Sequence, residues 1–106
     1  MLIRTFYTLL FTVLASSTVS ASSFGDAKLG KIKSPSCVFC HGQTGIAANS
    51  SYPNLNGQNA PYLYQAMKDY QQGTRTTPLA QMMAAQLRQL DDQDLKDVAA
   101  FYAEQP

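Results

Sequence analysis

The chain has 106 residues, of which 45% are hydrophobic and 14% are charged, and its formal net charge is +1. A chain of this length holds one small domain, and its balanced charge gives no basic footprint for nucleic acid. A domain of this size buries a limited core, so it commonly needs a metal, disulfides or a bound cofactor for stability.

The first 21 residues have the layout of a secretory signal peptide. The basic residue Arg4 precedes an apolar run over residues 6–15, and small residues then lead to Ala21. The apolar run is well short of the roughly 20 residues that cross a bilayer. We therefore expect cleavage after Ala21, which would leave an exported, periplasmic domain of residues 22–106 with no membrane span. An uncleaved N-terminal tether is the alternative.

Without Arg4, the mature chain carries seven basic and seven acidic side chains, so it is near neutral. This balance predicts weak electrostatic steering of any partner protein, with an association rate that depends little on salt.

Two stretches of the mature chain carry strong helical patterns. The first lies within residues 59–73, where Asn59 can cap the helix, Pro61 fits the first turn and Gly73 ends it. The second lies within residues 91–105, where an aspartate can cap the N-terminus and one face collects the apolar side chains Leu95, Val98, Ala99 and Tyr102.

Two shorter helices are expected within residues 26–32 and 79–90. The segments between the helices are rich in Gly, Asn, Ser, Thr and Pro, which is typical of loops. The sequence therefore predicts a small all-α domain of three or four helices, with a long structured loop over residues 42–58. A loop of that length in so small a domain usually has a function.

Both cysteines and the only histidine lie in the stretch SCVFCHG, as Cys37, Cys40 and His41. A Cys37–Cys40 disulfide would close a very small loop and leave the histidine unexplained. A thioredoxin-like dithiol belongs to an α/β fold, which this sequence does not indicate, and structural zinc needs four such ligands. C-x-x-C-H is the attachment signal for haem c, in which two thiols form thioethers and the histidine binds the iron. We therefore predict one covalently bound haem c, with His41 as its proximal ligand.

The opposite side of the iron needs another donor, because the chain has no second histidine. Ligation by histidine and methionine is common at haem iron, and the candidates are Met67, Met82 and Met83. Met67 lies in the apolar stripe of a strong helix and is expected in the core. The other two follow the loop-like stretch GTRTTP, and Met83 shares a helical stripe with Leu87.

Five motifs span residues 24 to 104 almost completely: GDAKLGK, CVFCHG, YPNLNGQ, YLYQAMKDYQQGTR and LDDQDLKDVAAFYA. With these motifs the chain resembles a class I c-type cytochrome of the small bacterial monohaem kind, and one domain of the dihaem bacterial cytochromes c. The resemblance implies a small cytochrome c fold, all-α, with three to four helices around one haem.

The resemblance also implies roles around the haem. The Pro53 carbonyl would accept the second imidazole proton of His41, which fixes the ring and raises its basicity. Leu55 would line the proximal haem face, and Gln58 and Arg75 would lie near the haem propionates.

Counting back from LDDQD, the resemblance places the ligand methionine at Met83. Met82 is the alternative, because the two methionines are adjacent and a shift of one residue exchanges them. The resemblance further implies that Gly30 lets an aromatic side chain of the last helix, Phe101 or Tyr102, approach closely.

These features favour an electron carrier over an enzyme. We expect a periplasmic carrier that passes single electrons between redox partner proteins, such as a respiratory complex or a terminal oxidase or reductase, by Fe(III)/Fe(II) cycling. Two alternatives are a haem domain fixed in a larger oxidoreductase, and a peroxidase or sensor with a labile methionine ligand. Phe39, Ile46 and Ala47 are candidates for an apolar docking rim.

Overall fold

The computed structural model describes residues 15–16 and 24–106. This part of the chain is all-helical, with five helices: α1 (Ala27–Lys33), α2 (Pro35–His41), α3 (Ala60–Gln71), α4 (Pro78–Leu87) and α5 (Asp92–Ala103). No helix within it is long and apolar enough to cross a membrane. The predicted signal peptide lies outside the described residues, except for Ala15 and Ser16. The predicted all-α fold is confirmed, with one helix more than expected.

The four predicted helices each begin at a side chain that accepts a hydrogen bond from the first turn, and these caps are Asp26, Asn59, Thr77 and Asp91. At α5 the bond is reciprocal, because Asp94 also accepts from the backbone N–H of Asp91. The additional helix is α2. It has seven residues, starts at Pro35 and has no side-chain cap, so its sequence carries little helical signal.

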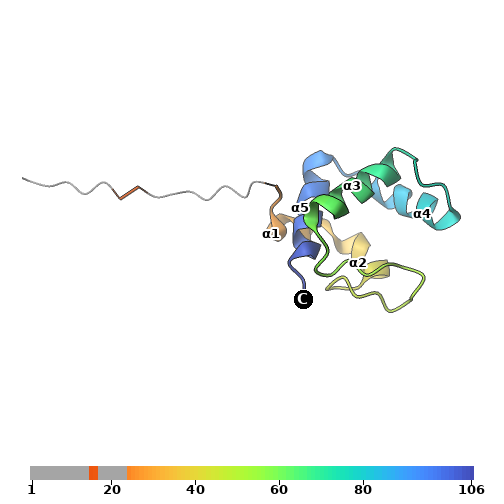
Figure 1. The fold of residues 1–106 in the computed structure, drawn as a ribbon, viewed down its shortest axis with the longest axis horizontal. Helices are drawn as coiled ribbons and strands as arrows, with labels where there is room; N and C mark the ends of the chain where they lie inside the picture. The colour runs from red at the N-terminus through yellow and green to blue at the C-terminus, as the bar shows by residue number, and fades with distance from the viewer. Residues whose placement is uncertain (1–14, 17–23) are drawn as a thin grey trace, which may run out of the picture.

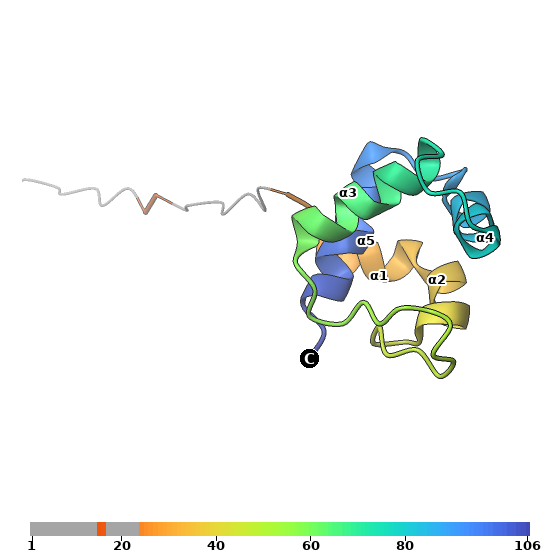
Figure 2. The ribbon, with the colours of Figure 1, turned by 45° about the vertical axis from the view of Figure 1, so that its right-hand side comes forward.

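The centre of the fold is the contact between α1 and α5. The helix α3 lies against α5 on another side, and α4 follows α3 back across the molecule (Figure 1). Figure 2 shows α4 and α2 on the same side of the molecule, with the loop of residues 42–59 below α2. The core consists mainly of side chains from α5 and α3, including Leu95, Val98, Tyr102, Leu63 and Met67.

The α1–α5 contact depends on the absence of a side chain at Gly30. A Cβ atom there would lie 1.9 Å from the carbonyl oxygen of Asp97 and 2.8 Å from the Cβ of Phe101. Of the two aromatic residues considered, it is therefore Phe101 that meets Gly30. Tyr102 instead lines the cavity described below.

An ionic network holds the same two helices together. The carboxylate of Asp97 is almost fully buried and accepts from the backbone N–H of Asp26 at 2.8 Å, from Lys33 Nζ at 2.7 Å and from Gln93 Nε2 at 2.9 Å. Burial opposes ionisation of Asp97, but these donors outweigh it and hold its pKa below the usual range. Lys33 also contacts Asp94 at 2.7 Å, and this contact is the main cause of the lowered pKa of Asp94.

Replacing Gly30 with alanine is expected to destabilise the domain. Alanine is the better helix former, so helix propensity alone would favour the substitution. The added methyl group would instead force α1 and α5 apart, at a cost of about 2 kcal/mol or more. Urea unfolding of the haem-containing protein measures this, with exposed Lys31→Ala on the same helix as the control. Equal stability of Gly30→Ala and the wild type would contradict the close contact.

The Asp97 network predicts a pH dependence of stability. Because the pKa values of Asp94 and Asp97 are lowered on folding, their contribution is fully present above about pH 4 and is lost as the pH falls through the folded pKa values. Asp97→Asn should therefore be less stable than the wild type at neutral pH, and the difference should shrink in acid. Urea unfolding at a series of pH values tests this, with exposed Glu104→Gln as the control. Parallel curves for wild type and Asp97→Asn would show that the network contributes nothing.

Candidate cofactor site

A cavity of about 350 Å³ opens between α2, α3, α4 and the loop of residues 42–59, with α5 at its base. This volume lies in the range of pockets that bind small molecules and cofactors. The walls are mainly apolar. All the site residues expected from the sequence line this one cavity: Cys37, Cys40, His41, Pro53, Leu55, Gln58, Arg75, Met82 and Met83.

The helix α2 places the two thiols and the imidazole on one side. Positions 37, 40 and 41 are related as i, i+3 and i+4, so they share one face of a helix, and all three line the cavity. Phe39 lies on the other side of the helix and is 93% exposed. Both thiols are free and partly buried, and burial raises the pKa of Cys37. The C-x-x-C-H spacing thus places its three functional side chains on one helical face. This arrangement was not expected from the sequence, because α2 was not predicted.

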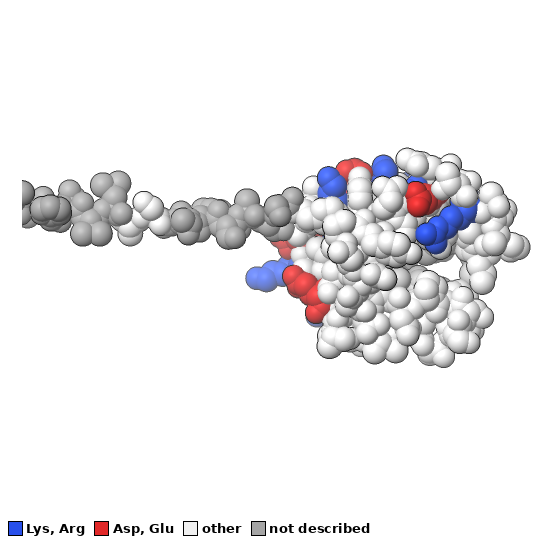
Figure 3. All heavy atoms as spheres, viewed as in Figure 1, with Lys and Arg blue, Asp and Glu red and all other residues white. Residues whose placement is uncertain are grey.

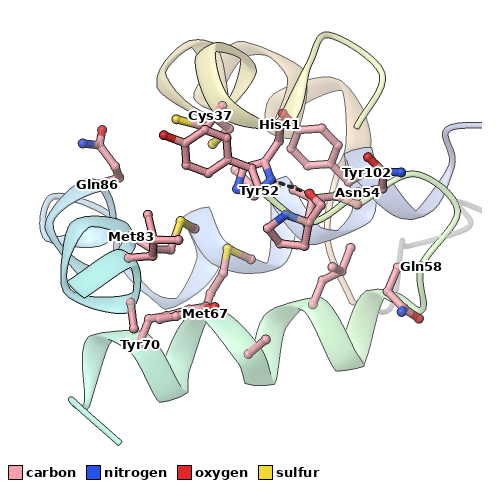
Figure 4. Close-up of a pocket in the computed structure, with 18 of the residues that line it drawn as sticks. Cys37, His41, Tyr52, Asn54, Gln58, Met67, Tyr70, Met83, Gln86 and Tyr102 are labelled. Carbon is pink, nitrogen blue, oxygen red and sulfur yellow. Dashed lines mark hydrogen bonds between the residues drawn. The ribbon is translucent and has the colours of Figure 1, made fainter. Parts of the chain in front are cut away.

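The imidazole of His41 is buried and held in one orientation. Its Nδ1 lies 2.8 Å from the carbonyl oxygen of Pro53, as the resemblance implied (Figure 4). A carbonyl can only accept, so Nδ1 is the donor, and the lone pair of the neutral ring then lies on Nε2. Nε2 makes no hydrogen bond within the described part of the chain. An imidazole in this tautomer is suited to bind a metal through Nε2.

Gly42 ends α2 and turns the chain directly after the imidazole. Its φ of 80° is unfavourable for other residues, and its N–H donates to the Val38 carbonyl at 2.9 Å. A Cβ at Gly42 would lie 2.1 Å from the carbonyl oxygen of Ile46. The loop can therefore fold back close to α2 and bring Pro53 to His41.

Three methionines line the cavity. In Figure 4 the side chain of Met83 enters from α4 and that of Met67 from α3, while His41 enters from α2. Met83 is partly buried against the core, whereas Met82 is 47% exposed. Met67 belongs to the core as expected, but the same side chain also forms part of the cavity wall.

Gln58 and Arg75 lie at opposite ends of α3. The helix has twelve residues, so it is roughly 18 Å long. Both side chains line the cavity, Gln58 near the start of this helix and Arg75 beyond its end. Arg75 stacks on Tyr70, with its guanidinium carbon 4.7 Å from the ring centroid, and donates to the Tyr70 hydroxyl at 3.0 Å. This hydrogen bond raises the pKa of Arg75. Leu55 packs against the core and lines the cavity, and its place on the proximal haem face stays a prediction.

Several polar side chains of the lining were not identified from the sequence. Tyr52 and Asn54 flank Pro53 in the YPNLNGQ motif, and Asn54 Oδ1 accepts from the backbone N–H of Ala47 at 2.8 Å, which closes the loop. Gln86 lines the cavity from α4 (Figure 4). Tyr102 is buried at the base, and this burial raises its pKa to about 12. The motif contained Tyr52 and Asn54, but periodicity gave no signal for Gln86.

The residues present fit a covalently attached haem. Two free thiols and an imidazole with an available Nε2 share one helical face, and they border a cavity with apolar walls and a methionine on another side. This all-helical fold and donor set define a c-type cytochrome domain. In agreement, residues 27–104 match the family model of cytochrome c. The chain belongs to the cytochrome c family and binds haem c covalently.

Relatives within the family differ in length. The chain is 42% identical over 81 residues to cytochrome c-554(548) of Halomonas halodenitrificans, which covers 76% of this chain and 98% of that protein. Its fold is similar to reduced cytochrome c4 from Pseudomonas stutzeri, with a TM-score of 0.69 and 34% identity over 77% of this chain and 46% of the other. It is also similar to thiosulfate dehydrogenase (TsdBA) from Marichromatium purpuratum, with a TM-score of 0.69 and 32% identity over 85% of this chain and 21% of that one. The chain thus spans less than half of the last two proteins.

Proposed function

We propose that this protein is a periplasmic monohaem electron carrier, with the haem attached through Cys37 and Cys40 and ligated by His41 and Met83. The observation that carries the proposal is the entry of His41 from α2 and Met83 from α4 into one cavity (Figure 4). When bound, the haem supplies a one-electron Fe(III)/Fe(II) couple. The periplasmic location rests on the signal-peptide pattern of residues 1–21.

Each of these residues has a role in the proposed carrier. The Pro53 carbonyl orients the imidazole and keeps the Nδ1 proton, so that Nε2 is the donor to iron. The sulfur of Met83 would supply the second protein ligand of a bound haem, which would leave no coordination site for a substrate. Apolar side chains that line the cavity, including Leu55, Leu63 and Val98, would keep water from a bound haem. A site in which the protein would provide both iron ligands supports electron transfer rather than catalysis.

Met83 is the preferred distal ligand for two reasons. It shares with buried Leu87 the side of α4 that faces the interior, because the two are four residues apart. Met82 is turned by about 100° on the helix and is half exposed. Met67 faces the cavity from α3 and is the second alternative.

A fixed subunit of a larger oxidoreductase is the second candidate function. The similarity to thiosulfate dehydrogenase (TsdBA) supports it. This chain matches only 21% of that protein, so a domain of this fold there is part of a larger oxidoreductase. The partners of a diffusible carrier would instead be separate redox proteins. Purification from native membranes and periplasm separates the two, since a subunit keeps a constant stoichiometry with its partner and a carrier does not.

The purified protein should behave as a closed, one-electron cytochrome. A pyridine haemochrome spectrum should show one c-type haem per chain, and a redox titration should follow a one-electron curve. Because methionine occupies the distal position, the reduced protein should not bind carbon monoxide and the oxidised protein should have no peroxidase activity. Carbon monoxide binding would favour a sensor or peroxidase with a labile ligand. Absence of covalent haem would refute the proposal entirely.

Met83→Ala should remove the methionine–iron charge-transfer band of the oxidised protein. It should also lower the reduction potential, on the order of 100 mV or more, because methionine ligation raises the potential of haem iron. Met82→Ala is the matched control and should keep both the band and the potential. Met67→Ala should keep the band and lose stability, by roughly 2 to 5 kcal/mol, because it opens a hole in the core. Loss of the band in Met82→Ala or Met67→Ala would reassign the ligand.

A further inference from the structure

The carbonyl of Pro53, which orients His41, belongs to a residue with little means of fixing its own position. The carbonyl oxygen lies 2.8 Å from His41 Nδ1. Proline has no backbone N–H, so Pro53 cannot donate a hydrogen bond that would tie it to the rest of the loop. Its neighbours in the chain must therefore hold this carbonyl in place.

The two arms of the loop are joined by hydrogen bonds directly after Pro53. The backbone N–H of Leu55 donates to the Gly45 carbonyl at 2.7 Å, and the backbone N–H of Ala47 donates to Asn54 Oδ1 at 2.8 Å. The second bond is made by the side chain of the residue next to Pro53, and its donor lies seven residues away in the other arm. Asn54 thus ties the segment that carries the Pro53 carbonyl to the arm that leaves α2.

We propose that Asn54 is a positioning residue for the proximal iron ligand: its side chain holds the loop so that the Pro53 carbonyl keeps its hydrogen bond to His41. This role rests on the proposed ligation of haem by His41, and it adds a residue that acts on this ligand through the loop. A bond at Nδ1 makes the imidazole a more basic donor at Nε2, which favours the more highly charged Fe(III). Asn54 therefore lowers the reduction potential relative to a loop that is free to move.

The surroundings of Asn54 make this effect measurable. The loop of residues 42–59 contains no Asp, Glu, Lys or Arg. In Figure 3 the lower right of the molecule, where α2 and this loop lie, is accordingly uncoloured. The side chain of Asn54 is itself neutral, so its removal takes no charge from the site. A shift of the potential in Asn54→Ala would then reflect the geometry of the loop and not a lost charge.

Hydrogen exchange of the His41 Nδ1 proton, followed by NMR of the reduced, haem-containing protein, tests the proposal. This proton exchanges when its bond to Pro53 opens, so its rate measures how often the loop moves away. Asn54→Ala should accelerate the exchange roughly threefold to tenfold, because losing one hydrogen bond commonly changes a local equilibrium by that factor. Asn49→Ala is the matched control and should keep the wild-type rate. Asn49 is also exposed, and its Oδ1 accepts from the backbone N–H of Ser51 at 2.9 Å in the same loop.

Two further measurements separate positioning from a general loosening of the loop. Asn54→Asp keeps an oxygen that can accept from Ala47, so its His41 proton should exchange at the wild-type rate. In Asn54→Ala the equilibrium constant for reduction should rise about threefold, which is ~28 mV for a one-electron couple at 59 mV per tenfold change. Asn49→Ala should leave the potential unchanged.

Unchanged exchange in Asn54→Ala would overturn the proposal, and so would equal acceleration in Asn54→Ala and Asn49→Ala. If Asn54→Ala does not keep its haem, faster exchange in Asn54→Asp than in the wild type would overturn it. These results are independent of the carrier function, which stands on the one-electron titration and the charge-transfer band. Conversely, a methionine other than Met83 at the iron would leave the expected exchange of the His41 proton as it is.

Discussion

The backbone of α1 meets the backbone of α5 at Gly30 with no side chain between them. The rest of the domain depends on this contact, because it determines which side of α5 is left for the other helices. With one side of α5 against α1, the side that carries Val98 and Ala99 faces α3 and the cavity. The buried Asp97, bound to Asp26 and Lys33, stabilises the contact from the edge. The base of the cofactor site is thus positioned by residues that do not line the cavity.

The site combines one local motif with distant segments. A single turn of α2 presents both thiols and the imidazole on one face, so their relative placement needs no long-range contact. The partner of the imidazole, by contrast, is a carbonyl twelve residues further along the chain, in a loop that Gly42 turns back toward α2. The sulfur that we propose as the second ligand, that of Met83, comes from α4. Attachment is therefore local, while orientation and ligation depend on the complete fold.

The parts that could be predicted from the sequence are those with local physical signals. The helices α3 and α5 were predicted because they have caps and an apolar face over three turns. The helix α2 was not, because seven residues without a capping hydrogen bond carry no readable period. The contact of His41 with Pro53 followed from family resemblance alone, since nothing local connects a histidine to a carbonyl twelve residues away. Met67 was placed in the core correctly, but one side chain can belong to both core and cavity wall where the two are continuous.

The charged side chains are unevenly distributed, because α2, the loop of residues 42–59 and α4 contain no Asp, Glu, Lys or Arg. In the described part of the chain the charged side chains lie in or directly beside α1 and α5, in the last part of α3, and at Arg75 and Arg88. An ion-exchange resin, a charged electrode or a layer of anionic lipid attracts a protein through its charged groups. Such a surface would hold this domain by the side away from α2 and the loop of residues 42–59 and leave these segments facing the solution. The protein would then be adsorbed with its cofactor still accessible to a second protein.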